Sequence, residues 1–171
     1  MSKLKDQGCW LIGTCLGLGL APIAPGSFGA LLGVVYYVVV AWFAPVAWHG
    51  WLLAAGLVLS TWATIALGPW AERYFRVKDS KNFVTDEVVG YLFTVLLYRT
   101  ENIWATAIIG FFVARIVDIA KIPPARRLEK LPAGWGVVAD DLLGSVYAAL
   151  LLHLARWMWP DLLGHAPQWL F

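Results

Sequence analysis

Residues 30–48 read ALLGVVYYVVVAWFAPVAW, and residues 51–70 read WLLAAGLVLSTWATIALGPW. Each stretch is uncharged and close to the length of about 20 residues that an α-helix needs to cross the hydrocarbon core of a bilayer. No residue between Asp6 and Glu72 carries a formal charge, and an ordinary soluble surface cannot be formed from such a segment. The two stretches therefore predict two membrane-spanning helices joined by a turn at residues 45–50.

The composition of the whole chain agrees with this interpretation. Of 171 residues, 60% are hydrophobic and only 14% are charged. No internal repeat or linker divides the chain, so residues 1–171 are expected to form a single integral-membrane domain. We predict an all-α fold, a polytopic helical membrane bundle with about four to five membrane segments. The last of these segments is expected at residues 142–160.

Two intermediate apolar segments, residues 88–98 and 103–114, are each too short to cross a bilayer alone. They become long enough only if Asp86-Glu87 and Arg115 to Asp118 lie on the helices themselves, facing protein rather than lipid. A partly immersed hairpin is the alternative for this region. In either arrangement the charged residues lie at the ends of apolar helices.

The segment that precedes residue 30 is rich in glycine and proline. Pro22 and Pro25 disfavour a helix immediately before them, so a loop is expected there. Ser27 would then be the N-cap of the following helix, where backbone N–H groups could hold an anion. The alternative is a loop that only leads the chain into the membrane. Gly29 and Gly33 have the small-residue spacing that allows two membrane helices to approach closely.

The positive charges are distributed unevenly along the chain. Eleven Lys and Arg residues lie in or beside the N-terminal region, the 71–87 loop and the 119–141 loop, whereas only Arg99 and Arg156 lie on the other side. Loops rich in Lys and Arg face the cytoplasm. We therefore predict that these three regions share the cytoplasmic face. The net charge of +2 is too small to indicate a nucleic-acid partner.

Acidic residues occur at three places beside the apolar segments: Asp86-Glu87, Asp118 and Asp140-Asp141. A carboxylate at the edge of a membrane segment is costly and is a candidate functional group. Carboxylates favour Mg²⁺, which binds one or two of them together with substrate phosphate. The nearby Lys and Arg residues could hold the phosphate of a lipid headgroup.

Two other interpretations of these charges remain open at this point. Arg115 and Asp118 could simply pair within one helix, while the loop cations bind anionic lipid. The protein could also be a small transporter or assembly subunit whose carboxylates carry a cation.

Other kinds of phosphoryl-transfer site are not indicated by the sequence. Cys9 and Cys15 lack the Cys-x5-Arg pattern and are expected to be packed or free thiols. His49, His153 and His165 fall on the far half of the bundle, where packing or interface roles are expected.

Four ordered motifs carry a resemblance to a known family. They are Gly17-Leu18-Gly19-Leu20-Ala21-Pro22-Ile23-Ala24-Pro25-Gly26-Ser27-Phe28-Gly29, Asp86-Glu87-Val88-Val89-Gly90, Arg115-Ile116-Val117-Asp118-Ile119-Ala120-Lys121 and Gly134-x-Gly136-Val137-x-x-Asp140-Asp141-x-x-x-Gly144. From about residue 13 to 150 the chain resembles phosphatidylglycerophosphatase A. The resemblance implies an all-helical, Mg²⁺-dependent enzyme of the bacterial inner membrane. Such an enzyme converts phosphatidylglycerophosphate to phosphatidylglycerol, a cardiolipin precursor.

The resemblance also implies roles for particular residues. The expected catalytic residues are Asp86, Glu87, Asp118, Asp140 and Asp141. The expected Mg²⁺ ligands are Asp86, Glu87, Asp140 and Asp141, with Asp79 as a further acidic position. The expected phosphate contacts are Gly26, Ser27, Arg115, Lys121 and Arg126. A phosphatase of the same build that acts on another lipid phosphate would show the same pattern. The oligomeric state is left open by the sequence.

Overall fold

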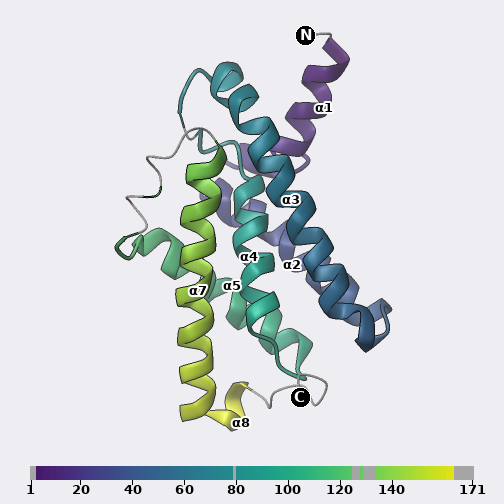
Figure 1. Cartoon of the computed structure of the whole chain (residues 1–171), viewed down its shortest axis with the longest axis vertical. Helices are drawn as coiled ribbons and strands as arrows, with labels where there is room; N and C mark the ends of the chain where they lie inside the picture. The colour runs from purple at the N-terminus through teal and green to yellow at the C-terminus, as the bar shows by residue number, and fades with distance from the viewer. Residues whose placement is uncertain (1–2, 79, 125–127, 129–133, 164–171) are drawn as a thin grey trace.

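The computed structural model describes residues 3–78, 80–124, 128 and 134–163. Figure 1 shows a bundle of helices, with no strand in the described part of the chain. The elements are α1 (Lys3–Gly13), η1 (Leu18–Leu20), α2 (Pro25–Phe43), α3 (Val46–Phe75), α4 (Thr85–Leu97), α5 (Ile103–Ala120), α7 (Gly134–Met158) and α8 (Pro160–Leu163). The all-α prediction is confirmed.

Four helices, α2, α3, α5 and α7, are long and apolar enough to cross a membrane. Large hydrophobic side chains such as Trp42, Trp62 and Phe112 are exposed on their outer faces. Such surfaces are stable in lipid, because a hydrocarbon environment replaces the water that would penalise them. The structure thus confirms a polytopic helical membrane bundle and gives four long spans, within the predicted four to five.

Helix α4 is different, because it is short and lies inside the bundle. Its 13 residues extend about 20 Å, less than the thickness of a hydrocarbon core. Val89, Tyr91, Leu92 and Val95 are almost completely buried, and the helix contacts α2, α3, α5 and α7 (Figure 1). The long helices therefore surround α4 and shield it from lipid.

The lengths of α4 and α5 confirm where the intermediate charged residues lie. Asp86 and Glu87 are in the first turn of α4, and Arg115 and Asp118 are in the last part of α5. With these residues included, α5 reaches 18 residues and qualifies as a span. The placement of the charges on the helices is therefore confirmed, but the length argument holds only for α5, because α4 is too short to cross a bilayer even with Asp86 and Glu87 included.

The start of α7 differs from the position that the sequence predicts. The sequence places Asp140 and Asp141 in a loop before a span that begins at residue 142, but α7 begins at Gly134. The stretch from Trp135 to Ala139 contains no proline, and its Val138 is buried, so the helix continues upstream of the carboxylates. Both aspartates therefore lie on a rigid helix rather than in a loop.

The helix starts at α2 and α3 also differ from the sequence prediction. Helix α2 begins at Pro25, and its N-cap is Ala24 with a φ of 50°, so Ser27 is an interior residue and not the cap. Proline is favoured at the first helical position, because its missing N–H is not needed there. Helix α3 begins at Val46, directly after Pro45, so the turn is shorter than the predicted 45–50 segment.

Glycines allow the close helix contacts that hold the bundle together. A Cβ atom on Gly29 would lie 2.6 Å from the Cβ atom of Val84, and one on Gly33 would lie 3.0 Å from the ring of Tyr91. This pair therefore fits α2 against α4 and the residues before it, as the spacing predicts. Gly144, by contrast, has open space around its Cα atom, so it does not mediate a close contact.

Candidate active site

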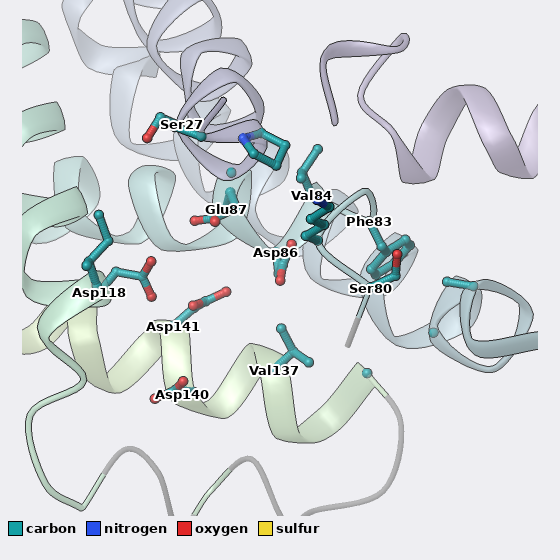
Figure 2. A pocket seen from close by; sticks show the side chains of 18 of the residues that line it. Ser27, Ser80, Phe83, Val84, Asp86, Glu87, Asp118, Val137, Asp140 and Asp141 are labelled. Carbon is teal, nitrogen blue, oxygen red and sulfur yellow. The ribbon is translucent and has the colours of Figure 1, made fainter. Parts of the chain in front are cut away.

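A cavity of about 410 Å³ lies at one end of the bundle, where the predicted acidic residues meet (Figure 2). Asp86 and Glu87 come from α4, Asp118 from α5, and Asp140 and Asp141 from α7. The other walls are the first turn of α2, part of α3 and the segment that leads into α4. Residues far apart in sequence are thus brought to one site, and the volume suits a small ligand or headgroup.

Asp86 and Asp141 have the most unusual surroundings of the five. Oδ1 of Asp86 and Oδ2 of Asp141 are buried, and neither has a hydrogen-bond partner among the described residues. Asp141 is only 9% exposed. A buried carboxylate oxygen without a partner is energetically costly, so it requires a cation, a proton or a water molecule. Figure 2 shows both carboxylates in the middle of the pocket.

Arg115 connects two of the acidic residues. It forms an ion pair with Glu87 from α4, and its Nη1 lies 2.9 Å from Oδ2 of Asp118 on its own helix. The simple Arg115 and Asp118 pair considered from the sequence is therefore present, but it is part of a link between α4 and α5. The Nε atom of Arg115 is buried and has no partner among the described residues. The guanidinium therefore retains a donor.

Lys121 makes a similar connection from the C-cap of α5. Its Nζ atom lies 3.5 Å from Oδ2 of Asp140 on α7. About four-tenths of the Lys121 side chain is exposed, whereas the side chain of Asp140 is largely buried. The lysine ammonium therefore lies at the edge of the cavity, where it can meet the phosphate of a ligand that enters from outside the bundle.

The first turn of α2 serves the site mainly through close packing. A Cβ atom on Gly26 would collide with the carboxylate of Glu87. The N–H groups of Ser27 and Phe28 donate to the Ala24 carbonyl, at 3.0 and 3.3 Å. In the first turn, only Gly26 keeps an N–H outside these bonds, because Pro25 has none. The backbone anion site expected here is therefore smaller than the sequence suggests, although Gly26 and Ser27 both line the cavity.

Ser145 is a supporting residue that the sequence did not reveal. Its Oγ atom lies 2.7 Å from the carbonyl oxygens of both Gly90 and Asp141, and the residue is buried. These contacts join α4 to α7 directly behind the carboxylates. A serine inside a long apolar helix has no sequence pattern that distinguishes such a role from ordinary packing.

The residues present are compatible with Mg²⁺. Among the described residues, no group of three His, Cys, Asp or Glu side chains forms a ready-made metal cage. Mg²⁺ does not require one, because it usually binds one or two carboxylates and fills its remaining positions with water and substrate phosphate. The partnerless oxygens of Asp86 and Asp141 provide such a donor set.

Cysteine chemistry does not fit the site. Cys9 and Cys15 are free, as predicted. Burial first, and then the negative charges of Asp86 and Glu87, raise the pKa of the Cys15 thiol to about 12. Its Sγ atom contacts the Val84 carbonyl at 3.5 Å. A thiol with this pKa is protonated at neutral pH and is a poor nucleophile.

The described histidines lie away from the cavity, also as predicted. The ring of His49 contacts the Ala44 carbonyl at 3.0 Å, and that of His153 contacts the Leu97 carbonyl at 3.1 Å. His165 lies outside the described residues, as do Asp79 and Arg126.

The cavity also contains residues that sequence reasoning did not select. They are Glu72 from α3 and Ser80, Lys81 and Phe83 from the segment before α4. The sequence shows a polar loop there, but it does not indicate which of the loop side chains face the carboxylates.

Comparison with known proteins shows which family the chain resembles. The phosphatidylglycerophosphatase A family profile matches residues 11–156. A Bacteroides thetaiotaomicron protein, provisionally named a phosphatidylinositol-3-phosphatase, is 36% identical over 86% of this chain and 93% of its own length. Proteins named phosphatidylglycerophosphatase A from Escherichia coli and Haemophilus influenzae are 28% and 30% identical. These alignments cover 93% and 86% of this chain and 90% and 89% of the relatives.

No solved structure matches the chain. The family match extends from the last turn of α1 to Arg156, near the end of α7, and includes every residue of the acidic cluster. We conclude that the chain belongs to the phosphatidylglycerophosphatase A family of membrane phosphatases.

Proposed function

We propose that the protein hydrolyses phosphatidylglycerophosphate to phosphatidylglycerol and inorganic phosphate, with Mg²⁺ as its cofactor. The observation that carries this proposal is the cavity in which five carboxylates meet Arg115 and Lys121 at the end of a membrane bundle. The names of the relatives from Escherichia coli and Haemophilus influenzae support the choice of lipid. The product is a phospholipid and a precursor for cardiolipin.

In this proposal Asp86 and Asp141 hold Mg²⁺, with Glu87 and Asp140 as neighbouring acidic groups. Bound Mg²⁺ would polarise the phosphoryl oxygen and favour ionisation of a water molecule. Arg115 and Lys121 bind the phosphate oxygens through charge-assisted hydrogen bonds. Glu87 and Asp118 keep the Arg115 guanidinium in place, and Asp140 does the same for the Lys121 ammonium.

The reaction is a phosphomonoester hydrolysis. A water oxygen forms a bond to phosphorus while the bond from phosphorus to the terminal glycerol oxygen breaks. A carboxylate of the cluster accepts the proton of the attacking water, and the departing glycerol oxygen takes up a proton. Helices α4 and α7 pack against each other, so the carboxylates that they carry are held in a defined arrangement around the position of the phosphate.

The proposed location is the bacterial inner membrane, with the cavity at the cytoplasmic face. The long apolar helices place the protein in a membrane. The concentration of Lys and Arg in the regions at the cavity end supports the orientation. Membership of a phosphatase family favours catalysis over the cation-carrying transporter that the charges alone would also allow.

A second substrate, phosphatidylinositol 3-phosphate, is favoured by one specific observation. The relative from Bacteroides thetaiotaomicron is more similar to this chain than the two named phosphatidylglycerophosphatases, at 36% identity. The experiment that separates the two is a comparison of kcat/KM for both lipids in mixed micelles. We expect a clear preference for phosphatidylglycerophosphate. Preferential hydrolysis of the inositol lipid, or no phosphate release from either lipid, would overturn the proposed substrate.

A further inference from the structure

The cavity extends beyond the acidic cluster toward the segment before α4. Figure 2 shows Asp118 on one side, Asp86 and Asp141 in the middle, and Ser80 and Phe83 on the other side. Glu72 and Lys81 also line this cavity. The site therefore has room and polar groups for more than the phosphate that is removed.

Lys81 differs from the other two described cations of the cavity. Arg115 pairs with Glu87 and Asp118, and Lys121 pairs with Asp140. Lys81 is exposed and forms no ion pair with a carboxylate in the described part of the chain. Its ammonium is thus available for an anionic group that lies away from the acidic cluster.

The substrates named for the relatives have a common chemical pattern. Phosphatidylglycerophosphate and phosphatidylinositol 3-phosphate each contain a phosphomonoester and a phosphodiester on the outer carbons of a three-carbon unit. The middle carbon carries a hydroxyl group in both lipids. A site that binds the monoester at the acidic cluster therefore needs a second cation for the diester and a hydrogen-bond acceptor for the hydroxyl group.

We propose that Lys81 binds the phosphodiester of the lipid. The Glu72 carboxylate and the Ser80 hydroxyl oxygen then accept a hydrogen bond that the middle hydroxyl group of the lipid donates. This inference rests on the proposed function and specifies its substrate class, which is lipids with a phosphomonoester and a phosphodiester separated by a hydroxyl-bearing carbon. Phosphatidic acid has one phosphate and no such diester. It would occupy the acidic cluster without using Lys81.

The test compares Lys81→Gln with wild type, Lys81→Arg and the control Lys78→Gln. Lys78 is an exposed lysine of the same loop that does not line the cavity. Purified full-length proteins are assayed in mixed micelles with phosphatidylglycerophosphate. Phosphatidic acid with the same acyl chains is used as an alternative substrate or competitive inhibitor, so that its KM or Ki is obtained for every variant.

We expect Lys81→Gln to raise the KM for phosphatidylglycerophosphate about tenfold without changing kcat, as the loss of one charge-assisted hydrogen bond would. The KM or Ki for phosphatidic acid should be the same in Lys81→Gln as in wild type. Lys81→Arg should restore most of the affinity for phosphatidylglycerophosphate, and Lys78→Gln should have the kinetic constants of wild type. An unchanged KM, or an equal rise for both lipids, would overturn the assignment. Failure of wild type to hydrolyse the two-phosphate lipids would instead contradict the proposed function itself.

Discussion

Each carboxylate of the cluster has a different set of neighbours, and these neighbours suggest how the work of the site is divided. Glu87 and Asp118 contact Arg115, and Asp140 contacts Lys121. Asp86 and Asp141 each keep a buried oxygen without a protein partner in the described residues. The first three therefore position cations, whereas the last two are the strongest candidates for holding a metal ion. Adjacent residues in the sequence, such as Asp140 and Asp141, thus serve different purposes.

Substitution of Arg115 should show its role as a link between helices. Arg115→Lys should lower kcat/KM by about 100-fold, because a single ammonium cannot bridge Glu87 and Asp118 as a guanidinium does. Arg115→Gln should also lower the melting temperature, since it leaves two partly buried acids without their partner. The measurements are phosphate-release kinetics and thermal unfolding in detergent. Arg156→Lys, on α7 at the far end, is the matched control, and equal losses from both lysine variants would refute the prediction.

For the buried thiol of Cys15, in contrast to Arg115, we predict that substitution leaves the activity largely intact. Cys15→Ala should retain most of the activity, and iodoacetamide should not inactivate the enzyme at neutral pH, because the raised pKa keeps the thiol protonated. The check is residual phosphate release after incubation with the reagent, with Cys9→Ala as the background. Rapid inactivation that Cys15→Ala abolishes would mean that the thiol is reactive.

At the scale of the elements, the site depends on how closely α7 and α2 approach their neighbours. A Cβ atom on Gly134 would lie 2.8 Å from the Cα atom of Ile65 in α3. A Cβ atom on Gly26 in α2 would likewise collide, in this case with the carboxylate of Glu87. These glycines permit contacts of helix termini with other backbone or charged groups, and the positions of the carboxylates follow from those contacts.

Gly134→Ala should therefore move the start of α7 away from α3 and reduce both activity and melting temperature. Gly144→Ala in the same helix is the control, because nothing lies within 4 Å of its added Cβ atom. The control should preserve activity and could gain about 0.5–1 kcal/mol of unfolding free energy from the better helix propensity of alanine. Comparable losses in both variants would show that the close contact at Gly134 is not important.

The element boundaries show what the sequence can and cannot predict. Segment length correctly required Arg115 and Asp118 to lie on α5, which would otherwise be too short to span. Asp86 and Glu87 do lie on α4, but not for the expected reason, because α4 is too short to span even with them. Length gave no such constraint for α7, which was already long enough without residues 134–141, so its start was misplaced. The interior location of α4 also could not be predicted, because apolar side chains suit both lipid and a protein core.

The same limit applies to the site. Charge at the ends of apolar segments was sufficient to select the five carboxylates, because such charges are costly in a membrane. Ser145 and Lys81 carry no comparable signal. A serine within a helix and a lysine within a polar loop are common, and only the packing of α4 against α7 and of the loop against the cavity distinguishes them.

For the whole molecule, the distribution of Lys and Arg predicts that the cavity faces the cytoplasm. Single cysteines introduced at Lys78 and at Glu101, in a background without Cys9 and Cys15, test this orientation. In intact cells a membrane-impermeant maleimide should label position 101, at the far end between α4 and α5, and not position 78. Permeabilised cells should label both. Labelling of position 78 alone in intact cells would reverse the proposed orientation.

The most direct test of the whole account is phosphate release from phosphatidylglycerophosphate by the purified protein, with Mg²⁺ or with excess chelator. Wild type is compared with Asp86→Asn, Asp141→Asn and the exposed control Glu101→Gln, after unfolding curves show that all are folded. We predict release by wild type and control with Mg²⁺. Either Asn variant or the chelator should reduce release by at least about 100-fold. Undiminished release from folded Asp86→Asn and Asp141→Asn, or in chelator, would contradict the account.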